Sequence, residues 1–317
     1  MSQKWILGKS PDEVGAFVAE FAELVSMDDP AMKRMVAKNP RTAFAQIVAK
    51  DEDTGVPKFR NLDKLQKLIA PHACRVLKRD CLDLPPKVYQ QAYFDLAPAQ
   101  RRAYGLMKEE CRIVLDGQET PVRRLGALTK LQQITSGFVL LDGEVLRPPQ
   151  LADNPRLDAL LELVEDDDAP MIVWARFREE LRVIADALRK AGRRVVEYHG
   201  GVSAAEREAA VDAMQGGEAD CFVGQPQAGG IGLTLTRAEW TVYYSNDFNL
   251  ETRIQSEDRN HRKGTTASVR YVDLIARNTI DEAITRSLQR KERLGATLLG
   301  DRKLLAAVHG ADPDDLD

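Results

Sequence analysis

The sequence predicts an α/β protein in which a parallel sheet, with helices on both faces, is preceded by a mainly helical region. From about residue 154 onward, short apolar strands alternate with amphipathic helices. Such alternation produces right-handed crossovers, and therefore a parallel sheet covered on both sides. Before residue 150, apolar residues recur mostly at the three- to four-residue spacing that is typical of helices.

The first part of the chain favours helix in three places. Residues 1–60 carry apolar positions at helical spacing: Val14, Phe17, Val18, Phe21 and Leu24. Residues 62–70 and 98–114 continue this pattern. Between these two helices, the alternation over residues 88–94 follows a pair of prolines and predicts an extended segment. Asp142-Gly143 predicts a turn.

The second part reads as regular alternation. The predicted strands are 171–174, 194–198, 220–224, 240–245 and 269–275. The predicted helices are 157–164, 179–191, one that begins after Ser203, 254–262 and 280–299. Gly192 closes the second of these helices. Ser203 and Glu206 form a capping box at the start of the third.

Composition excludes several classes of protein. The net charge is −4 with a pI near 5.8, which argues against a binder held by bulk positive charge. The 45 Lys and Arg residues could still concentrate on one face. Four cysteines and four histidines are scattered, so we expect neither a disulfide framework nor a metal site. The absence of a long apolar run or signal peptide predicts a cytoplasmic protein with no membrane association, ending in a disordered acidic tail at 301–317.

The decapeptide at residues 255–264 carries the strongest functional signal. On the predicted helix, Arg259 and Arg262 are three residues apart and share a face, with Gln255 one turn earlier. A guanidinium binds phosphate oxygens with two hydrogen bonds and keeps its charge at any physiological pH. The decapeptide therefore indicates a site for a transferring phosphoryl group. Taken alone, it is equally compatible with a solvated charged face.

Further candidates follow the predicted strands, at the edge where parallel sheets gather functional groups. The glycine cluster at 229–232 is either a tight turn or a loop that brings backbone amides to a phosphate. His199 has no partner acid or thiol in the sequence, so we give it little catalytic weight. Asp281 and Glu282 open a helix, where acids stabilise the helix dipole, and we interpret them as structural.

Nothing in the chain supplies a credible Walker A or Walker B motif. Gly8-Lys9-Ser10 resembles the end of a phosphate loop, but the required earlier glycine is replaced by Gln3. The acidic run at 165–168 follows a helix rather than a strand, so we read it as a solvated turn and not as a magnesium site.

The order of these segments resembles the C-terminal half of superfamily-two helicases of the Swi/Snf type, over roughly residues 60–300. Residues 75–87 look like that family's connector between its two motor lobes. Residues 96–100 with Tyr104 resemble the helix that follows. Residues 171–177 look like the first strand of the second lobe, 228–235 resemble motif V, and 255–264 resemble motif VI.

The resemblance implies a RecA-like C-terminal lobe at 151–300, with a helical protrusion and inter-lobe connector at 61–150. Residues 1–60 are unassigned and could be the end of a first lobe. In this family, ATP and magnesium are held mainly by the first lobe, which this chain lacks. The residues implied by the resemblance are Arg259 and Arg262 as arginine fingers; Gln255, Gly230 and Gly232 at the nucleotide; and Arg176, Gly200, Gly201, Gln225 and Gln227 at the DNA backbone.

Two positions depart from the family pattern. Thr234 stands where the family often has Asn, and Pro226-Gln227 stands where a Thr-Arg pair is common. The first departure weakens the expected nucleotide contact, and the second weakens the expected contact with DNA.

The function implied is the second motor lobe of an ATP-dependent DNA helicase or translocase. We expect double-stranded DNA to be bound without sequence preference, because phosphate contacts carry no sequence information. A first RecA-like lobe, in trans or in a longer chain, would complete the ATPase, and the chain alone would be inactive. The alternative is a non-catalytic DNA-binding or partner-regulating module derived from a helicase lobe. A third reading, an unrelated parallel α/β protein with a structural arginine cluster, does not explain the ordered match.

Overall fold

The computed structural model describes residues 59–69, 82–115, 118–121, 124–165, 167–228 and 233–298. The helices expected within residues 1–58, the glycine cluster at 229–232 and the acidic tail at 301–317 lie outside this part. The chain divides into two compact units, one of residues 77–285 and one of residues 1–76 with 286–317. The domain boundaries expected from the resemblance stay predictions.

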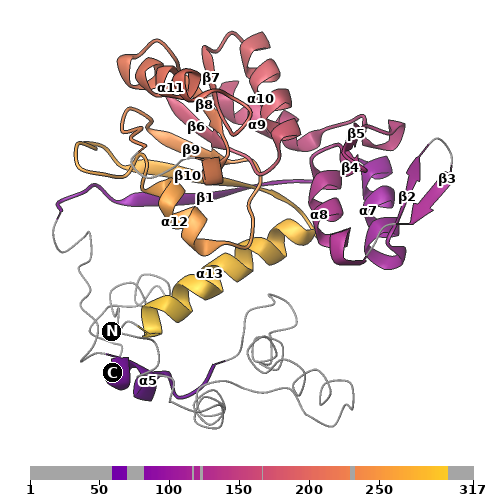
Figure 1. Ribbon diagram of the computed structural model, residues 1–317, viewed down its shortest axis with the longest axis horizontal. Coiled ribbons are helices and arrows are strands. Elements are labelled where there is room, and N and C mark those ends of the chain that lie inside the picture. Colours follow the sequence, from indigo (N-terminus) through magenta and orange to yellow (C-terminus); the bar gives the residue numbers. More distant parts are fainter. Residues whose placement is uncertain are drawn as a thin grey trace. The chain divides into compact units, whose positions relative to one another are not determined.

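A six-stranded parallel sheet in the order β1-β10-β9-β6-β8-β7 forms the centre of the larger unit (Figure 1). This confirms the predicted parallel sheet. Its strands are β1 (Lys87–Phe94), β6 (Met171–Trp174), β7 (Val195–Tyr198), β8 (Cys221–Gly224), β9 (Trp240–Tyr243) and β10 (Val269–Ala276).

The extended segment that precedes the protrusion is the edge strand β1. It pairs with β10 along its whole length, from Lys87 opposite Val269 to Phe94 opposite Ala276. Alternation in the sequence predicted its extended backbone but not this partner, because pairing between segments so far apart leaves no local trace. The connector is therefore part of the same sheet as the strands that follow.

Helices cover both faces of the sheet, as predicted. Met171 and Val173 of β6 pack with α9 (Pro155–Glu165) and α10 (Arg178–Lys190) in one apolar cluster. The alternate residues Ile172 and Trp174 belong to a second cluster with α11 (Ala204–Gly216). Because strand side chains alternate between faces, β6 contributes to both cores.

The helix ends follow the expected chemistry. The side chain of Ser203 accepts a hydrogen bond from the Glu206 amide at 3.2 Å, and the Glu206 carboxylate accepts one from the Ser203 amide at 2.9 Å. Gly192, just after α10, has a φ of 83°, which glycine adopts without strain. The capping box and the glycine stop are both confirmed.

The protrusion consists of two helices and two small hairpins. Helix α7 (Pro98–Glu110) is followed by the hairpin β2 (Arg112–Leu115) and β3 (Gln118–Pro121). The prediction of helix through residue 114 was wrong, because the β-branched Ile113 and Val114 enter a strand. Helix α8 (Arg124–Thr135) was not predicted. The hairpin β4 (Val139–Leu141) and β5 (Glu144–Leu146) turns at the predicted Asp142-Gly143.

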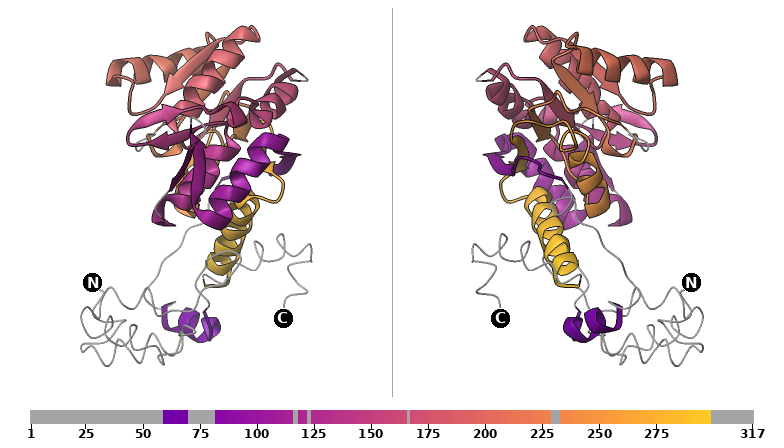
Figure 2. Two further views of the ribbon diagram at one scale, coloured as in Figure 1. Left: turned by 90° about the vertical axis from the view of Figure 1, so that its right-hand side faces the viewer. Right: turned by 90° about the vertical axis from the view of Figure 1, so that its left-hand side faces the viewer.

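The other described elements are short, except for the last helix. Helix α5 (Leu62–Ile69) confirms the predicted 62–70 segment. Two 3-10 turns lie at Pro149–Leu151 and Pro226–Ala228. Helix α13 (Ile280–Leu298), yellow in Figure 2, begins in the larger unit, at the predicted position.

Candidate nucleic-acid and nucleotide interface

Three residues expected at DNA come together at the carboxyl edge of the sheet. Arg176 follows β6, and Gln225 and Gln227 follow the neighbouring strand β8. The side chain of Gln225 donates to the Arg176 carbonyl at 2.8 Å. The Arg176 amide in turn donates to the hydroxyl of Ser245, after β9, at 2.8 Å. The ends of three adjacent strands are thus joined by hydrogen bonds.

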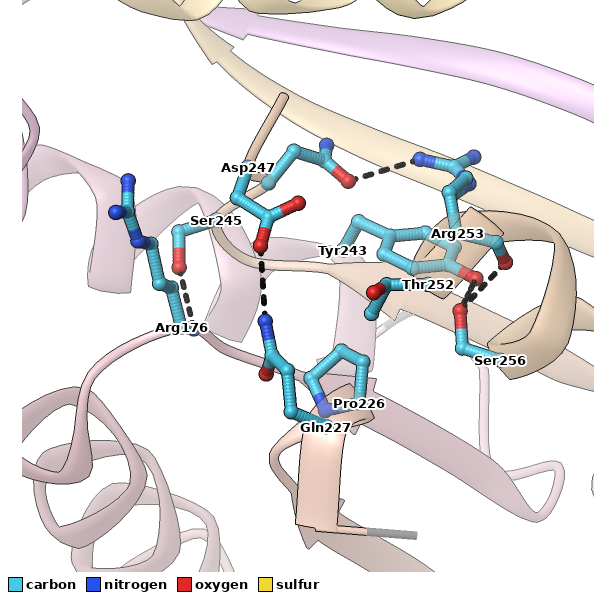
Figure 3. A pocket seen from close by; sticks show the side chains of 10 residues that line it. Arg176, Pro226, Gln227, Tyr243, Ser245, Asp247, Thr252, Arg253 and Ser256 are labelled. Carbon is cyan, nitrogen blue, oxygen red and sulfur yellow. Dashed lines mark hydrogen bonds between the residues drawn. The ribbon is translucent and has the colours of Figure 1, made fainter. Parts of the chain in front are cut away.

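A small pocket lies at this edge (Figure 3). Arg176 and Gln227 line it, and the Gln227 amide donates to the Asp247 carboxylate at 2.9 Å. The remaining lining residues are Pro226, Tyr243, Ser245, Asn246, Thr252, Arg253 and Ser256. The lining thus combines two arginines with one carboxylate and several hydroxyl and amide groups.

Gly200 and Gly201 lie one strand further along the same edge, after β7, and are not among the residues that line the pocket. Their turn is tight. The Gly201 amide donates to Nδ1 of His199 at 3.0 Å, and a Cβ on Gly201 would meet the same ring at 3.0 Å. His199 therefore has a structural role in shaping this turn.

Gln132 of α8 bonds two residues that line the pocket, Arg176 and Asn246, and the sequence did not reveal this role. Its amide nitrogen donates to the Asn246 carbonyl at 2.8 Å, and its amide oxygen accepts from the guanidinium of Arg176. The side chain is buried. A single neutral residue in an unpredicted helix carries no signal of this kind in the sequence. The protrusion therefore contributes to the position of Arg176.

A buried carboxylate also stabilises the loop that carries Arg176. Glu180 of α10 accepts hydrogen bonds from the hydroxyls of Ser136 and Ser245, both at 2.6 Å. Burial raises the pKa of Glu180, and the nearby Arg156 and the hydrogen bonds only partly offset this. Glu180 links the end of α8 to the residue that holds the Arg176 amide.

The arginines of the decapeptide do not lie on a helix, and that prediction was wrong. Helix α12 (Leu250–Glu257) ends before them, with Asp258 as its C-cap. The side chain of Asn260 is buried beneath the following turn, where it bonds Thr241 at 3.0 Å and Tyr271 at 3.0 Å. These tertiary bonds hold the turn in place of further helical bonds. Gly264 completes it with a φ of 104°.

Arg259 and Arg262 nevertheless remain close neighbours. Burial and the charge of Arg262 lower the pKa of the Arg259 guanidinium. Arg262 donates to the Thr234 hydroxyl at 2.9 Å and to the Leu233 carbonyl at 3.2 Å. The Arg259 carbonyl accepts from the Leu235 amide at 2.8 Å. The segments that resemble motifs V and VI are therefore in direct contact.

The remaining nucleotide candidates are placed differently. Gln255 is exposed on α12, and its amide donates to Glu251 of the same helix at 3.0 Å. Gly230 and Gly232 lie outside the described residues. Thr234, the departure from the family pattern, uses its hydroxyl to hold Arg262.

Arg253 forms a second arginine centre that sequence reasoning missed. Its guanidinium bonds Asp273 at 2.5 Å and Glu257 at 2.8 Å, and it stacks 3.5 Å above the Tyr243 ring. Burial alone would lower its pKa, but Asp273, Tyr243 and Glu257 raise the pKa well above its usual value. Arg253 lies among charged and polar residues at 251–258, and nothing in that stretch of sequence distinguishes a paired, buried arginine from an exposed one.

Within the described ranges, no group of three or more His, Cys, Asp or Glu side chains could hold a metal ion. No helix in the same part of the chain is both long and apolar enough to cross a bilayer.

The chain is similar to known proteins in sequence. Residues 155–264 match the helicase conserved C-terminal domain. The chain is 27% identical over 258 residues to the Mus musculus SWI/SNF-related matrix-associated actin-dependent regulator of chromatin subfamily A member 1, covering 77% of this chain and 25% of that protein. It is 25% identical over 248 residues to the Danio rerio chromodomain-helicase-DNA-binding protein 1-like, covering 75% of this chain and 24% of that protein.

One solved structure supports the architecture. The C-terminal part of the Fun30 ATPase domain superposes with a TM-score of 0.53 at 16% identity, covering 69% of this chain and 99% of that chain. These findings confirm the RecA-like fold and the resemblance to the C-terminal half of Swi/Snf-type superfamily-two helicases. The chain spans about a quarter of the length of the curated relatives that it matches.

Proposed function

We propose that this helicase C-terminal lobe is the second motor lobe of an ATP-dependent translocase on double-stranded DNA. The observation that carries the proposal is the pair Arg259 and Arg262, held together on one turn by the 233–235 segment. The relatives are named as chromatin regulators and ATPases, and their length leaves room for the other half of such a motor.

The arginine pair fits a polyphosphate. Two guanidiniums in proximity repel each other, which is one cause of the lowered pKa of Arg259. A phosphate between or beside them removes that penalty and accepts their hydrogen bonds. ATP, when bound, supplies the phosphoryl group to be transferred. Arg259 and Arg262 stabilise the charge that develops on it, a role worth roughly 10³–10⁵ in rate in related sites.

Magnesium does not fit the described part of this lobe, where no acidic cluster could ligate it. We therefore assign its ligands, and most contacts to ATP, to a first RecA-like lobe. Gln255, Gly230 and Gly232 remain candidates for the nucleotide face of this one. With half of the site, the lobe on its own would not hydrolyse ATP.

The carboxyl edge of the sheet is the proposed DNA surface. Arg176 would contact the phosphate backbone, with Gln225 and Gln227 beside it. Gly200 and Gly201, in the turn after β7, would let the backbone of that turn come close to the same phosphates. Arg176 donates hydrogen bonds to Gln132 and Ser245 and accepts one from Gln225, and these bonds hold its loop before any DNA is bound. Contacts of this kind position a protein on DNA without reading its sequence.

The test is ATP hydrolysis after addition of a first-lobe polypeptide, or within a longer chain, with and without double-stranded DNA. We expect DNA-stimulated hydrolysis that Arg262→Ala lowers by at least about a thousandfold. Arg182→Ala is the matched control, because Arg182 pairs with Glu179 and Asp186 on the exposed side of α10. Hydrolysis that survives Arg262→Ala unchanged would refute the proposal.

A further inference from the structure

The connector is attached directly to the end of α12, where the arginine turn begins. The ammonium group of Lys87 donates to the carboxylate of Glu257 at 2.8 Å, and the hydroxyl of Tyr89 donates to the same oxygen at 2.7 Å. Both residues lie on β1. Two side chains of the connector strand thus converge on one buried carboxylate.

A third contact reaches into the turn itself. Nε2 of His261 lies 2.7 Å from the carbonyl oxygen of Pro85, just before β1. Because a carbonyl can only accept, the histidine must carry its proton on Nε2. His261 lies between Arg259 and Arg262, so the connector touches the turn at its centre.

Glu257 joins the connector to the body of the lobe. Its other carboxylate oxygen accepts from Arg253 at 2.8 Å, and its backbone carbonyl accepts from Tyr271 at 3.0 Å. The Tyr271 ring stacks on Tyr89, with centroids 5.4 Å apart. Only 6% of the Glu257 side chain is exposed. Its charge is balanced by Arg253 and Lys87, as a buried carboxylate requires.

The turn is therefore held from two directions. On one side, Leu233, Thr234 and Leu235 bond its backbone and Arg262. On the other side, Pro85, Lys87 and Tyr89 hold His261 and Glu257. The peptide between Glu257 and Arg259 is too short to absorb a displacement of the helix end, so a shift of the connector must reach the arginines.

We propose that Glu257, which accepts hydrogen bonds from Lys87 and Tyr89, is a positioning residue: when the connector moves, Glu257 moves with it and shifts Arg259 and Arg262. The inference rests on the proposed function, in which the two arginines act on a phosphoryl group and the connector leads to the first lobe. A movement between lobes then changes the alignment of the arginines without any direct contact between the first lobe and their turn.

The connection can be broken without removing β1 from the sheet. β1 stays paired to β10 from Lys87 to Phe94 through its backbone, whatever side chain is present at position 87. Lys87→Met keeps the length of the apolar stem and removes only the charge. Arg194→Met is the matched control, because Arg194 pairs with Asp220 at the amino ends of β7 and β8 and is bonded to no residue of the turn.

Two measurements test the inference. In the chain alone, hydrogen–deuterium exchange of residues 258–265 should accelerate in Lys87→Met and not in Arg194→Met. In the presence of a first lobe, Lys87→Met should lower kcat for ATP hydrolysis by about ten- to a hundredfold, as expected for misplaced catalytic groups, with little change in KM. In an Arg262→Ala background the same substitution should have a smaller effect on kcat, because only Arg259 is left to be misplaced.

Three outcomes would overturn the inference: unchanged exchange at 258–265, accelerated exchange spread evenly over the sheet, or an undiminished effect of Lys87→Met in the Arg262→Ala background. The last two would mean that Lys87 acts only through general stability. The proposed function fails if Arg262→Ala alone leaves ATP hydrolysis unchanged. That result does not involve Lys87, so the two failures are distinguishable.

Discussion

Arg262 donates a hydrogen bond to the hydroxyl of Thr234 at 2.9 Å, which ties the turn after α12 to the segment before β9. The two residues are 28 positions apart in sequence. The bond uses a residue at which this chain departs from the usual pattern of its relatives. It makes the side chain at 234 part of the support for the arginine.

Thr234→Val should weaken this support. Valine keeps the shape of threonine but removes one of two acceptors of the Arg262 guanidinium, leaving the Leu233 carbonyl, a loss of about 1–3 kcal/mol for a hydrogen bond to a charged group. We expect ATP hydrolysis with a first lobe to fall by a factor of about 5 to 140, by the usual conversion of about 1.4 kcal/mol per factor of ten. Thr234→Ser retains the hydroxyl and should stay close to the parent. Equal losses in both variants would contradict the role of the hydroxyl.

Arg176→Ala should weaken DNA binding equally for unrelated sequences. Removing one phosphate contact lowers the slope of log K against log salt by about one. Fluorescence anisotropy at several salt concentrations, on two duplexes of different sequence, measures both effects. Arg182→Ala, on the exposed side of α10, is the control and should leave the slope unchanged.

Gln132→Ala tests whether the protrusion positions Arg176. The substitution removes the acceptor for the Arg176 guanidinium and the donor to the Asn246 carbonyl. We expect a smaller loss of DNA affinity than for Arg176→Ala, and no additional loss when the two are combined. Additive losses in the double variant would show that Gln132 acts on DNA independently.

Arg253→Met should destabilise the fold strongly. The buried carboxylates of Asp273 and Glu257 would lose their shared partner. Breaking a buried ion pair in this way typically lowers the free energy of unfolding by about 3–5 kcal/mol. Urea unfolding monitored by circular dichroism measures the change. Arg194→Met removes an exposed ion pair and should have a much smaller effect. Similar losses in both variants would argue against a special role for the Arg253 cluster.

The pH dependence of stability should carry the signature of Glu180. Burial raises its pKa above the usual value near 4.5, so the folded state holds this proton more tightly than the unfolded state. The contribution of Glu180 to stability is then full below the unfolded pKa and is lost as the pH rises through the folded pKa. Glu180→Gln, which cannot ionise, should therefore gain stability over the parent as the pH rises. A difference that does not depend on pH would contradict this assignment.

The sequence predicted the parallel sheet because its signals are local. Met171 to Trp174 is a short apolar run between turn signals. Ser203 and Glu206, three residues apart, cap the start of α11. The end of α12 could not be predicted in the same way. Arg259 and Arg262 fit a helical pattern, but the buried bonds of Asn260 to Thr241 and Tyr271 hold the chain in a turn.

The candidate site shows the same division. Arg176, Gln225 and Gln227 were found because each follows a strand, and strand ends meet at one edge. Gln132 and Arg253 were missed because their importance depends on partners far away in sequence, Asn246 for the first and Asp273 for the second. The residues adjacent to Gln132 and Arg253 in the sequence do not indicate these partners.

The pairing of β1 with β10 has a consequence for how the chain is made. β1 is synthesised before every other strand of its sheet, yet its hydrogen-bonding partner is the last strand to emerge from the ribosome. Until then its backbone groups have no partner in the sheet, and its exposed Tyr89 and Tyr93 are open to other chains. The edge of the sheet can therefore close only after β10 has been synthesised.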